Sequence, residues 1–179
     1  YGVESGVKEM SLDAQKKSFC MSVAYSGNGR FVACGLQDGS VTIFDVSTGS
    51  VYHHLDAHSL TVRSLSFSLD SSLLISSSDD KSIHVYDVKS GALSRVLSGH
   101  ESSVFCVRVS PNGKHFASCS ADRSVRIWEL STLECIHVFE GAHADIVRSL
   151  AYNHDGSCLA SVSSDLSLKL YNCPLDDSK

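Results

Sequence analysis

The chain repeats one arrangement of polar residues at a nearly constant interval. A histidine precedes an aspartate by 22 residues in three successive copies, at 58 and 80, 100 and 122, and 143 and 165. Counted on the aspartate and starting from Asp38, the copies lie 42, 42 and 43 residues apart. Such a repeat indicates a unit that buries its apolar faces against the next copy, because one copy alone is too small to enclose a core.

Each copy predicts four short β-strands. The run after each aspartate alternates β-branched or aromatic residues with others, as in SVRIWE at 124–129, which is typical of a strand. Between the other apolar runs lie turn signals such as SPNGK at 110–114 and NHDGS at 153–157, whose Asn-Gly and Asp-Gly pairs tolerate the positive φ of hairpin turns. No stretch shows helical periodicity. The repeat therefore predicts an all-β fold of four-stranded β-propeller blades.

The copies predict one propeller region over 1–179, with about four blades' worth of strands and no linker. We also predict a strand at 6–12, which precedes the first whole copy and belongs to none of the copies in this chain. We divide the chain into an orphan outer strand in 1–15, whole blades at 16–57, 58–99 and 100–142, three strands of a last blade at 143–174, and a tail at 175–179. Ring closure leaves three alternatives: a preceding half completes a seven-bladed ring, the chain closes as four blades, or two chains exchange strands.

Several residues of the repeat resemble the WD-repeat family. The resemblance rests on the Gly99-His100 pair, the step to Asp122 and the run that ends in Trp128 and Glu129. It implies that a histidine, a serine, an aspartate and an aromatic residue form a buried hydrogen-bonded chain in each blade. By position, these networks are His58, Ser76, Asp80 and Tyr86; His100, Ser118, Asp122 and Trp128; and His143, Ser161, Asp165 and Tyr171.

The first copy departs from this pattern. It has Lys16 at the histidine position, Cys34 at the serine position and Phe44 at the aromatic position. Two expectations remain open for this blade: it lacks the network, or Lys16 pairs with Asp38.

Serine, histidine and aspartate together also suggest a hydrolase. Against catalysis, the three recur in three copies at one spacing, whereas an active site needs one set, and the chain has no G-x-S-x-G motif. The consecutive His53 and His54 would point to opposite faces of a strand, which disfavours a two-histidine metal site. We therefore predict a protein that is not an enzyme and that uses no cofactor or metal.

A second set of residues is predicted to line one rim of the blades. If the histidine and aspartate of each copy are held together, their neighbours are presented at the same end of the ring. These neighbours are Met21, Arg63, Phe105 and Arg148 after the histidine position, and Gln37, Asp79, Ala121 and Ser164 before the aspartate. Arginine, methionine and aromatic residues are enriched at protein interfaces. The alternative is that these side chains pack between blades.

Charge and cysteine content restrict the partners. The net charge is −5, and the basic residues are scattered, which argues against direct binding of nucleic acid or anionic lipid. No apolar run approaches the roughly 20 residues that span a bilayer. Seven cysteines, an odd number without a C-x-x-C pair, lie mostly in apolar runs, which favours a reducing compartment over a disulfide framework.

The resemblance to WD-repeat proteins implies a non-catalytic scaffold that docks proteins on a rigid ring. Within the family, stretches such as SGHESSVFCVRVSPNGKHFASCSADRSVRIWEL (98–130) resemble the WD-repeat subunits of the superkiller complex, which animals share with the polymerase-associated factor complex. This implies cytoplasmic and nuclear roles in 3′–5′ messenger RNA decay and transcription, beside a helicase and a tetratricopeptide subunit. The alternatives are a substrate adaptor for ubiquitination or a signalling scaffold. We also expect self-association, with strand 6–12 pairing with 166–172 of another chain.

Overall fold

The computed structural model describes residues 10–14 and 17–173, and this part contains fifteen strands and no helix. No helix in the described residues could span a membrane. The prediction of an all-β fold is confirmed. The strands are β1 (Cys20–Tyr25), β2 (Phe31–Leu36), β3 (Val41–Asp45), β4 (Ser50–Leu55), β5 (Val62–Phe67), β6 (Leu73–Ser78), β7 (Ile83–Asp87), β8 (Leu93–Leu97), β9 (Val104–Val109), β10 (His115–Ser120), β11 (Val125–Glu129), β12 (Cys135–Phe139), β13 (Val147–Tyr152), β14 (Cys158–Ser163) and β15 (Leu168–Asn172).

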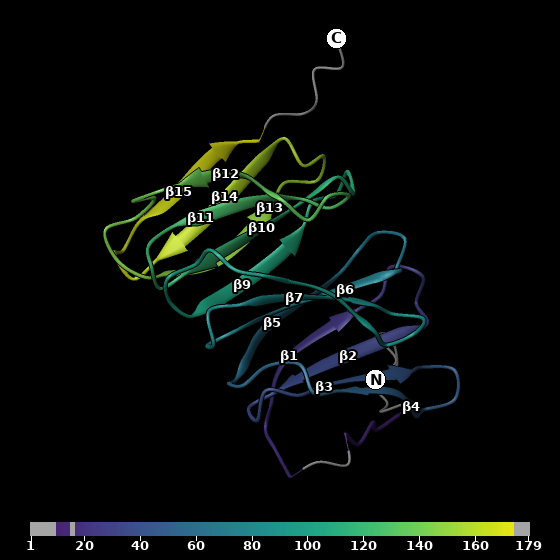
Figure 1. Cartoon of the computed structure of the whole chain (residues 1–179). Helices are drawn as coiled ribbons and strands as arrows, with labels where there is room; N and C mark the ends of the chain where they lie inside the picture. Colours follow the sequence, from purple (N-terminus) through teal and green to yellow (C-terminus); the bar gives the residue numbers. More distant parts are fainter. Residues whose placement is uncertain (1–9, 15–16, 174–179) are drawn as a thin grey trace.

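The strands form four antiparallel meanders in chain order. The sheets are β1-β2-β3-β4, β5-β6-β7-β8, β9-β10-β11-β12 and the three-stranded β13-β14-β15. Figure 1 shows them stacked in succession, from β1–β4 at one end to β13–β15 at the other. The strands of each sheet fall inside one predicted unit.

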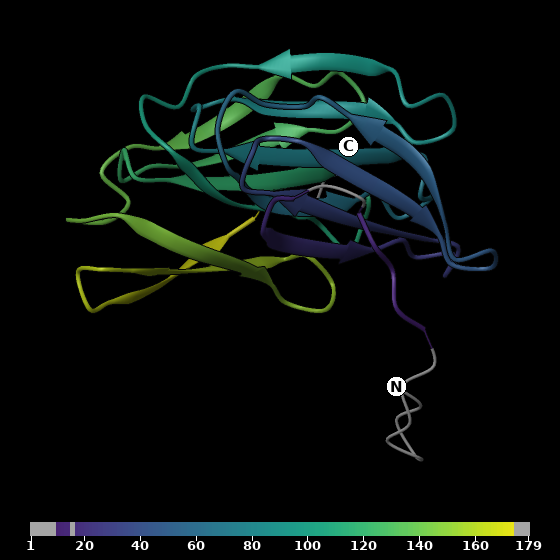
Figure 2. The same cartoon turned by 90° about the horizontal axis from the view of Figure 1, so that it is seen from below.

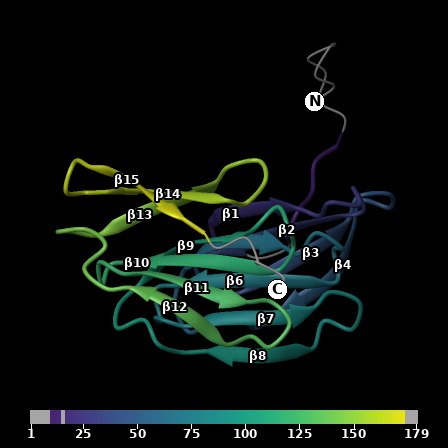
Figure 3. The same ribbon diagram turned by 90° about the horizontal axis from the view of Figure 1, so that it is seen from above.

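Neighbouring sheets pack face to face through their first strands. β1 lies against β5, β5 against β9, and β9 against β13, whereas β8 and β12 lie on the outside of the stack (Figure 3). The same order is visible from the opposite side (Figure 2). Between the sheets lie separate apolar cores; the third, for example, joins Leu150 and Leu159 of the last sheet to Ile127 of the sheet before it. Strands covered on both faces explain runs such as Val41–Asp45, in which every residue is buried.

The turn after each repeated aspartate uses a left-handed residue. Gly39 occupies this position in the first sheet with a φ of 90°. The other sheets place Lys81, Arg123 and Leu166 there, with φ of 73°, 71° and 68°. Residues with a Cβ atom adopt this conformation at a cost of roughly 1–2 kcal/mol, so the surrounding hydrogen bonds must hold the turn in place.

Of the strand predicted at 6–12, the structure describes only residues 10–12. Residues 10–12 are not in a strand, and residues 6–9 lie outside the described residues. Leu12 and Ala14 instead pack on Phe44 and Cys34 of the first sheet. These residues contribute apolar contact rather than backbone pairing, and self-association through this segment stays a prediction.

Exposed apolar side chains gather on the two end sheets. Val23 and Tyr25 of β1 are 71% and 58% exposed, and Leu168 and Leu170 of β15 are 62% and 67% exposed. The corresponding side chains of the inner sheets are buried or half-buried, as at Leu65 and Val107. Both ends of the stack therefore present surface suited to further sheet packing.

The left-handed turn at Leu166 gives a stability prediction. Leu166 is 98% exposed, so its side chain contributes little packing, while its φ strains the backbone. Leu166→Gly is expected to stabilise the chain by roughly 0.5–1 kcal/mol, after allowing for the greater freedom of glycine in the unfolded chain. Chemical denaturation measures the change. Leu168→Gly, in the adjoining strand, is the control and should destabilise; a destabilised Leu166→Gly protein would contradict the strain argument.

Candidate functional site

The third sheet holds a complete hydrogen-bonded chain from its entering loop to its third strand. Nδ1 of His100 lies 2.8 Å from Oδ2 of Asp122, and Nε2 lies 2.8 Å from Oγ of Ser118. The indole nitrogen of Trp128 donates to the same Oγ at 2.8 Å. Because an ionised carboxylate only accepts, Nδ1 of His100 carries a proton in its bond to Asp122, and a proton-free Nε2 can accept from the serine hydroxyl.

The second and fourth sheets repeat the bonds of the histidine. His58 bonds Asp80 at 3.0 Å and Ser76 at 2.8 Å. The distances from His143 to Asp165 and Ser161 are 2.9 and 2.6 Å. The three imidazoles are at most 1% exposed. Each aspartate also accepts the backbone N–H that follows its histidine, as Asp122 does from Glu101 at 3.0 Å. One carboxylate thus fastens the incoming loop to the turn after the second strand.

The aromatic end of the chain differs between sheets. The hydroxyl oxygens of Tyr171 and Ser161 lie 3.2 Å apart, within hydrogen-bond distance. The hydroxyl of Tyr86 instead meets Nδ1 of His84 at 3.0 Å, so the chain expected through Ser76 does not reach it. The ring of His84 stacks on that of His58, with ring centroids 4.0 Å apart. In this position His84 is the hydrogen-bond partner of the Tyr86 hydroxyl. Sequence reasoning missed His84.

The first sheet keeps only part of this arrangement. Oδ1 of Asp38 accepts from the amide and hydroxyl of Ser40, and Ser18 accepts the Asp38 amide at 3.0 Å. Cys34, at the serine position, is buried, and its burial together with the nearby Cys20 raises the thiol pKa to about 12. Lys16 lies outside the described residues, so its pairing with Asp38 stays a prediction.

A serine two residues after each aspartate belongs to the site but was not predicted. Ser82, Ser124 and Ser167 each donate from Oγ to the aspartate Oδ1, at 2.6, 2.6 and 2.7 Å. Their amides donate to the same atom, at 2.9 to 3.0 Å. The signal was present, because Asp-x-Ser recurs in all four copies, including 38–40.

These bonds set the charge state of the site. Burial disfavours the Asp122 carboxylate, but hydrogen bonds from His100 and Ser124 outweigh it and hold the pKa of Asp122 well below its usual range. The bond from Ser167 contributes most to the lowered pKa of Asp165. Burial lowers the pKa of His58 despite the neighbouring Asp80. The second sheet therefore pairs the Asp80 carboxylate with a neutral His58 imidazole, and their hydrogen bond holds the incoming loop to the turn.

The predicted rim residues come from equivalent positions of neighbouring strands. Met21, Arg63, Phe105 and Arg148 lie on β1, β5, β9 and β13, which pack side by side. Met21 and Arg148 are exposed, whereas Arg63 and Phe105 are half-buried. Of the second predicted set, Gln37 is exposed, and Asp79, Ala121 and Ser164 are half-buried.

Two arginines hold the Phe105 ring between them. The guanidinium carbon of Arg63 lies 5.6 Å from the ring centroid, and that of Arg148 lies 5.1 Å away. Both distances are in the range of a cation–π interaction. Asp79 binds Nε and Nη2 of Arg63 at 2.9 and 2.6 Å, and Ser164 accepts from Nε of Arg148 at 2.9 Å. The structure thus brings five of the eight predicted rim residues into one cluster.

Comparison with known families agrees with this geometry. Residues 49–87, 91–129 and 133–172 match the model described as WD domain, G-beta repeat. The chain belongs to the WD-repeat family. Each matched segment contains the last strand of one sheet and the first three strands of the next, such as β4 followed by β5–β7. The WD repeat of the sequence therefore straddles two sheets, and the histidine–aspartate bond falls inside it. Residues 8–61 also match the WD40 domain of anaphase-promoting complex subunit 4.

Three curated proteins resemble parts of this WD-repeat chain. It is 46% identical over 61 residues to WD repeat-containing protein VIP3 of Arabidopsis thaliana, covering 34% of this chain and 19% of that protein. It is 39% identical over 75 residues to meiotic recombination protein rec14 of Schizosaccharomyces pombe, covering 42% and 24%. It is 44% identical over 77 residues to WD repeat-containing protein SL1-17 of Schistosoma mansoni, covering 43% and 25%. The matches span about a fifth to a quarter of these relatives.

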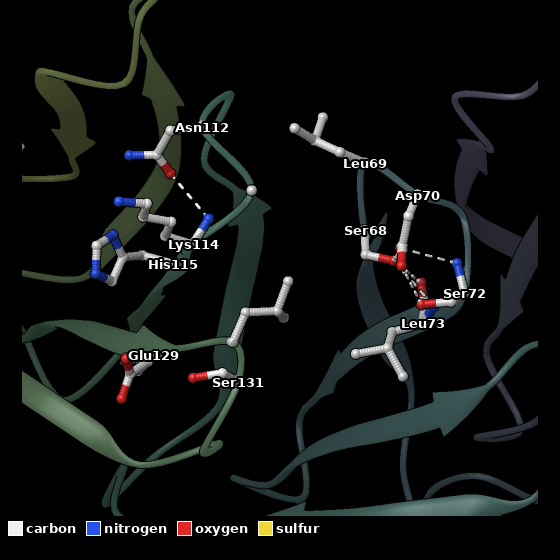
Figure 4. Close-up of a pocket in the computed structure, with 12 residues that line it drawn as sticks. Ser68, Leu69, Asp70, Ser72, Leu73, Asn112, Lys114, His115, Glu129 and Ser131 are labelled. Atoms are coloured by element: carbon white, nitrogen blue, oxygen red, sulfur yellow. Dashed lines mark hydrogen bonds between the residues drawn. The ribbon is translucent and has the colours of Figure 1, made fainter.

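The opposite rim of the WD-repeat stack contains a hollow of about 700 Å³. One wall comes from the turn 68–72 and the other from the turn 110–114 together with the end of β11 (Figure 4). Asp70 on the first wall is engaged by its own turn, and hydrogen bonds from Ser68 and Ser72 lower its pKa. Within the described residues, no group of three histidines, cysteines or carboxylates could hold a metal ion.

Because Asp122 holds the incoming loop to the turn, its replacement should lower stability more than replacement of the adjacent Arg123. Asp122→Ala leaves the buried His100 and two backbone amides without their acceptor, which is expected to cost roughly 2–3 kcal/mol of unfolding free energy. Arg123 is exposed, so Arg123→Ala should change stability by less than about 0.5 kcal/mol. Thermal and chemical denaturation of both variants measure the difference. Equal melting temperatures would defeat the network interpretation.

The stacked histidines predict a loss of stability in mild acid. Burial, with a smaller effect of the nearby His58, lowers the pKa of His84 to about 4 from its ordinary 6.5. Between these values the unfolded chain binds a proton that the folded chain does not, so stability falls as the pH drops from about 6.5 to about 4. His84→Gln should flatten this slope in denaturation series across that range. His154→Gln, at an exposed site, is the control, and identical slopes for the wild type and the His84→Gln protein would contradict the prediction.

Proposed function

We propose that this chain is a docking scaffold that binds partner proteins on the rim formed by Met21, Arg63, Phe105 and Arg148. The observation that carries the proposal is the Arg63–Phe105–Arg148 stack, which is partly exposed and held by Asp79 and Ser164. Arginine and aromatic side chains supply much of the binding energy at protein interfaces. A rim that is already ordered also loses less entropy on binding. WD-repeat proteins typically act as non-catalytic scaffolds, which supports this function over catalysis.

We further propose that the whole protein is the WD-repeat subunit of the superkiller complex, with a second role in the polymerase-associated factor complex. This assignment rests on the resemblance of stretches such as 98–130 to those subunits. It places the helicase and tetratricopeptide subunits among the partners and the protein in both cytoplasm and nucleus. RNA chemistry would belong to the partners, because the net charge of −5 disfavours direct RNA binding by this chain.

The similarity to meiotic recombination protein rec14 supports a second candidate assembly. In that case the same rim would dock a protein of the recombination machinery. The two candidates share the docking surface and differ in the proteins that co-purify.

Affinity purification of the tagged full-length protein tests the proposal. Phe105→Ala removes the ring between the two arginines and is expected to weaken capture of the helicase and tetratricopeptide subunits by about tenfold or more. Leu69→Ala, on the opposite rim and 56% exposed, is the matched control and should capture both. Circular dichroism and melting temperatures establish that the variants are folded. Equal capture by both variants would refute docking on this rim, and recovery of only recombination proteins would favour the second assembly.

A further inference from the structure

In the second and fourth sheets, an arginine and the side chain that accepts its Nε–H are the same number of residues apart. Arg63 and Asp79 are 16 residues apart, as are Arg148 and Ser164. In both sheets Nε of the arginine donates to the side chain that precedes the repeated aspartate, at 2.9 Å. The second sheet supplies a carboxylate there, and the fourth sheet supplies a neutral hydroxyl. The hydrogen bond from Nε is repeated, but the negative charge and the second bond from Nη2 are not.

The charge of Arg148 is consequently not neutralised within the described residues. Its hydrogen bond from Nε to Ser164 is its one side-chain hydrogen bond there, and it has no ion pair in that part of the chain. The nearest acidic residue in sequence, Asp145, accepts the amide of Ile146 through its carboxylate. Arg63, in contrast, has a bidentate ion pair with Asp79.

The orientation of Arg148 leaves a specific part of its guanidinium available. Phe105 lies 5.1 Å from the guanidinium carbon, and Ser164 takes the Nε–H. The two Nη nitrogens make no hydrogen bond with the described residues, and Arg148 is exposed. These nitrogens form the end-on fork that binds a carboxylate with two parallel hydrogen bonds. Stacking on the ring limits the side-chain entropy that such binding would cost.

We propose that Arg148 binds an aspartate or glutamate side chain of the docked protein, and that Phe105 packs against an apolar side chain next to it. This inference rests on the proposed docking function of the rim. A carboxylate suits the site better than a phosphate group, because one fork with one positive charge matches a monoanion. Arg63 is already neutralised by Asp79, so a second cation for a dianionic group is not available in this cluster.

The charge pattern of the second sheet supplies the test. Ser164→Asp should give Arg148 the internal carboxylate that Arg63 already has, while leaving Arg148 and Phe105 in place. Ser164→Asn is the matched control, since it adds a side chain of similar size without charge. Asp79→Ser is the reciprocal change, which should free the Arg63 fork.

The probe is a random peptide library selected on the immobilised chain, followed by titration of the best peptides. Selected peptides should be enriched in aspartate or glutamate beside an apolar residue. Affinity for the Ser164→Asp protein should fall roughly tenfold relative to the wild type, with little change for Ser164→Asn. Replacing the peptide carboxylate by its amide should give a similar loss on the wild type. Asp79→Ser should strengthen binding of the acidic peptides.

The outcomes separate this inference from the proposed function. If Phe105→Ala abolishes binding but Ser164→Asp and Ser164→Asn behave alike, the rim docks proteins without carboxylate recognition and this inference fails. Peptides that bind only when phosphorylated would also overturn it. If Phe105→Ala has no effect on any selected peptide, or no peptide is selected, docking at this rim fails and the inference fails with it.

Discussion

The hydrogen bond between a buried imidazole and a turn carboxylate fastens the incoming loop of each of the last three sheets. In the third sheet, Asp122 accepts from His100, from the amide of Glu101 and from Ser124. These donors lie in the incoming loop and in the turn itself. Without the carboxylate, the buried imidazole of His100 would lose its charged acceptor, and leaving a buried donor unsatisfied costs more than a single surface bond gains.

The same fastening explains how the turns tolerate unfavourable backbone geometry. Arg123 has a φ of 71°, and its neighbour Ser124 bonds Asp122 through both amide and hydroxyl. These bonds require the left-handed residue between the two, so the strain is the cost of closing the turn around the carboxylate. Because the hydrogen bonds determine the turn, the residue in the left-handed position can vary from glycine to lysine, arginine or leucine.

Periodicity predicted the strands and the histidine–aspartate pairs well. Each strand follows from local alternation of residues, and each histidine–aspartate pair follows from the fixed spacing of 22 residues. Periodicity could not predict contacts that depend on how particular rings pack. The bond from Tyr86 to His84 depends on the stacking of His84 over His58, and no spacing rule encodes that stack. The apolar contacts of Leu12 with the first sheet are likewise not encoded in the repeat. The Arg63–Asp79 pair could have been inferred from the sequence. In an antiparallel hairpin, a residue near the start of the first strand lies beside a residue near the end of the second, as Arg63 and Asp79 do.

A repeated scaffold separates the residues that maintain structure from those that distinguish one sheet from another. The histidine, the aspartate and the serine two residues after it are identical in the last three sheets, so they cannot give one sheet a property that the others lack. The sheets differ at the adjoining rim positions, where Arg63 bonds to Asp79 but Arg148 bonds to Ser164. The change from carboxylate to hydroxyl keeps the hydrogen bond from Nε of the arginine, removes the second bond from Nη2, and alters the electrostatic potential of the surface. Rigid repeats therefore allow a binding surface to vary in charge without a change in fold.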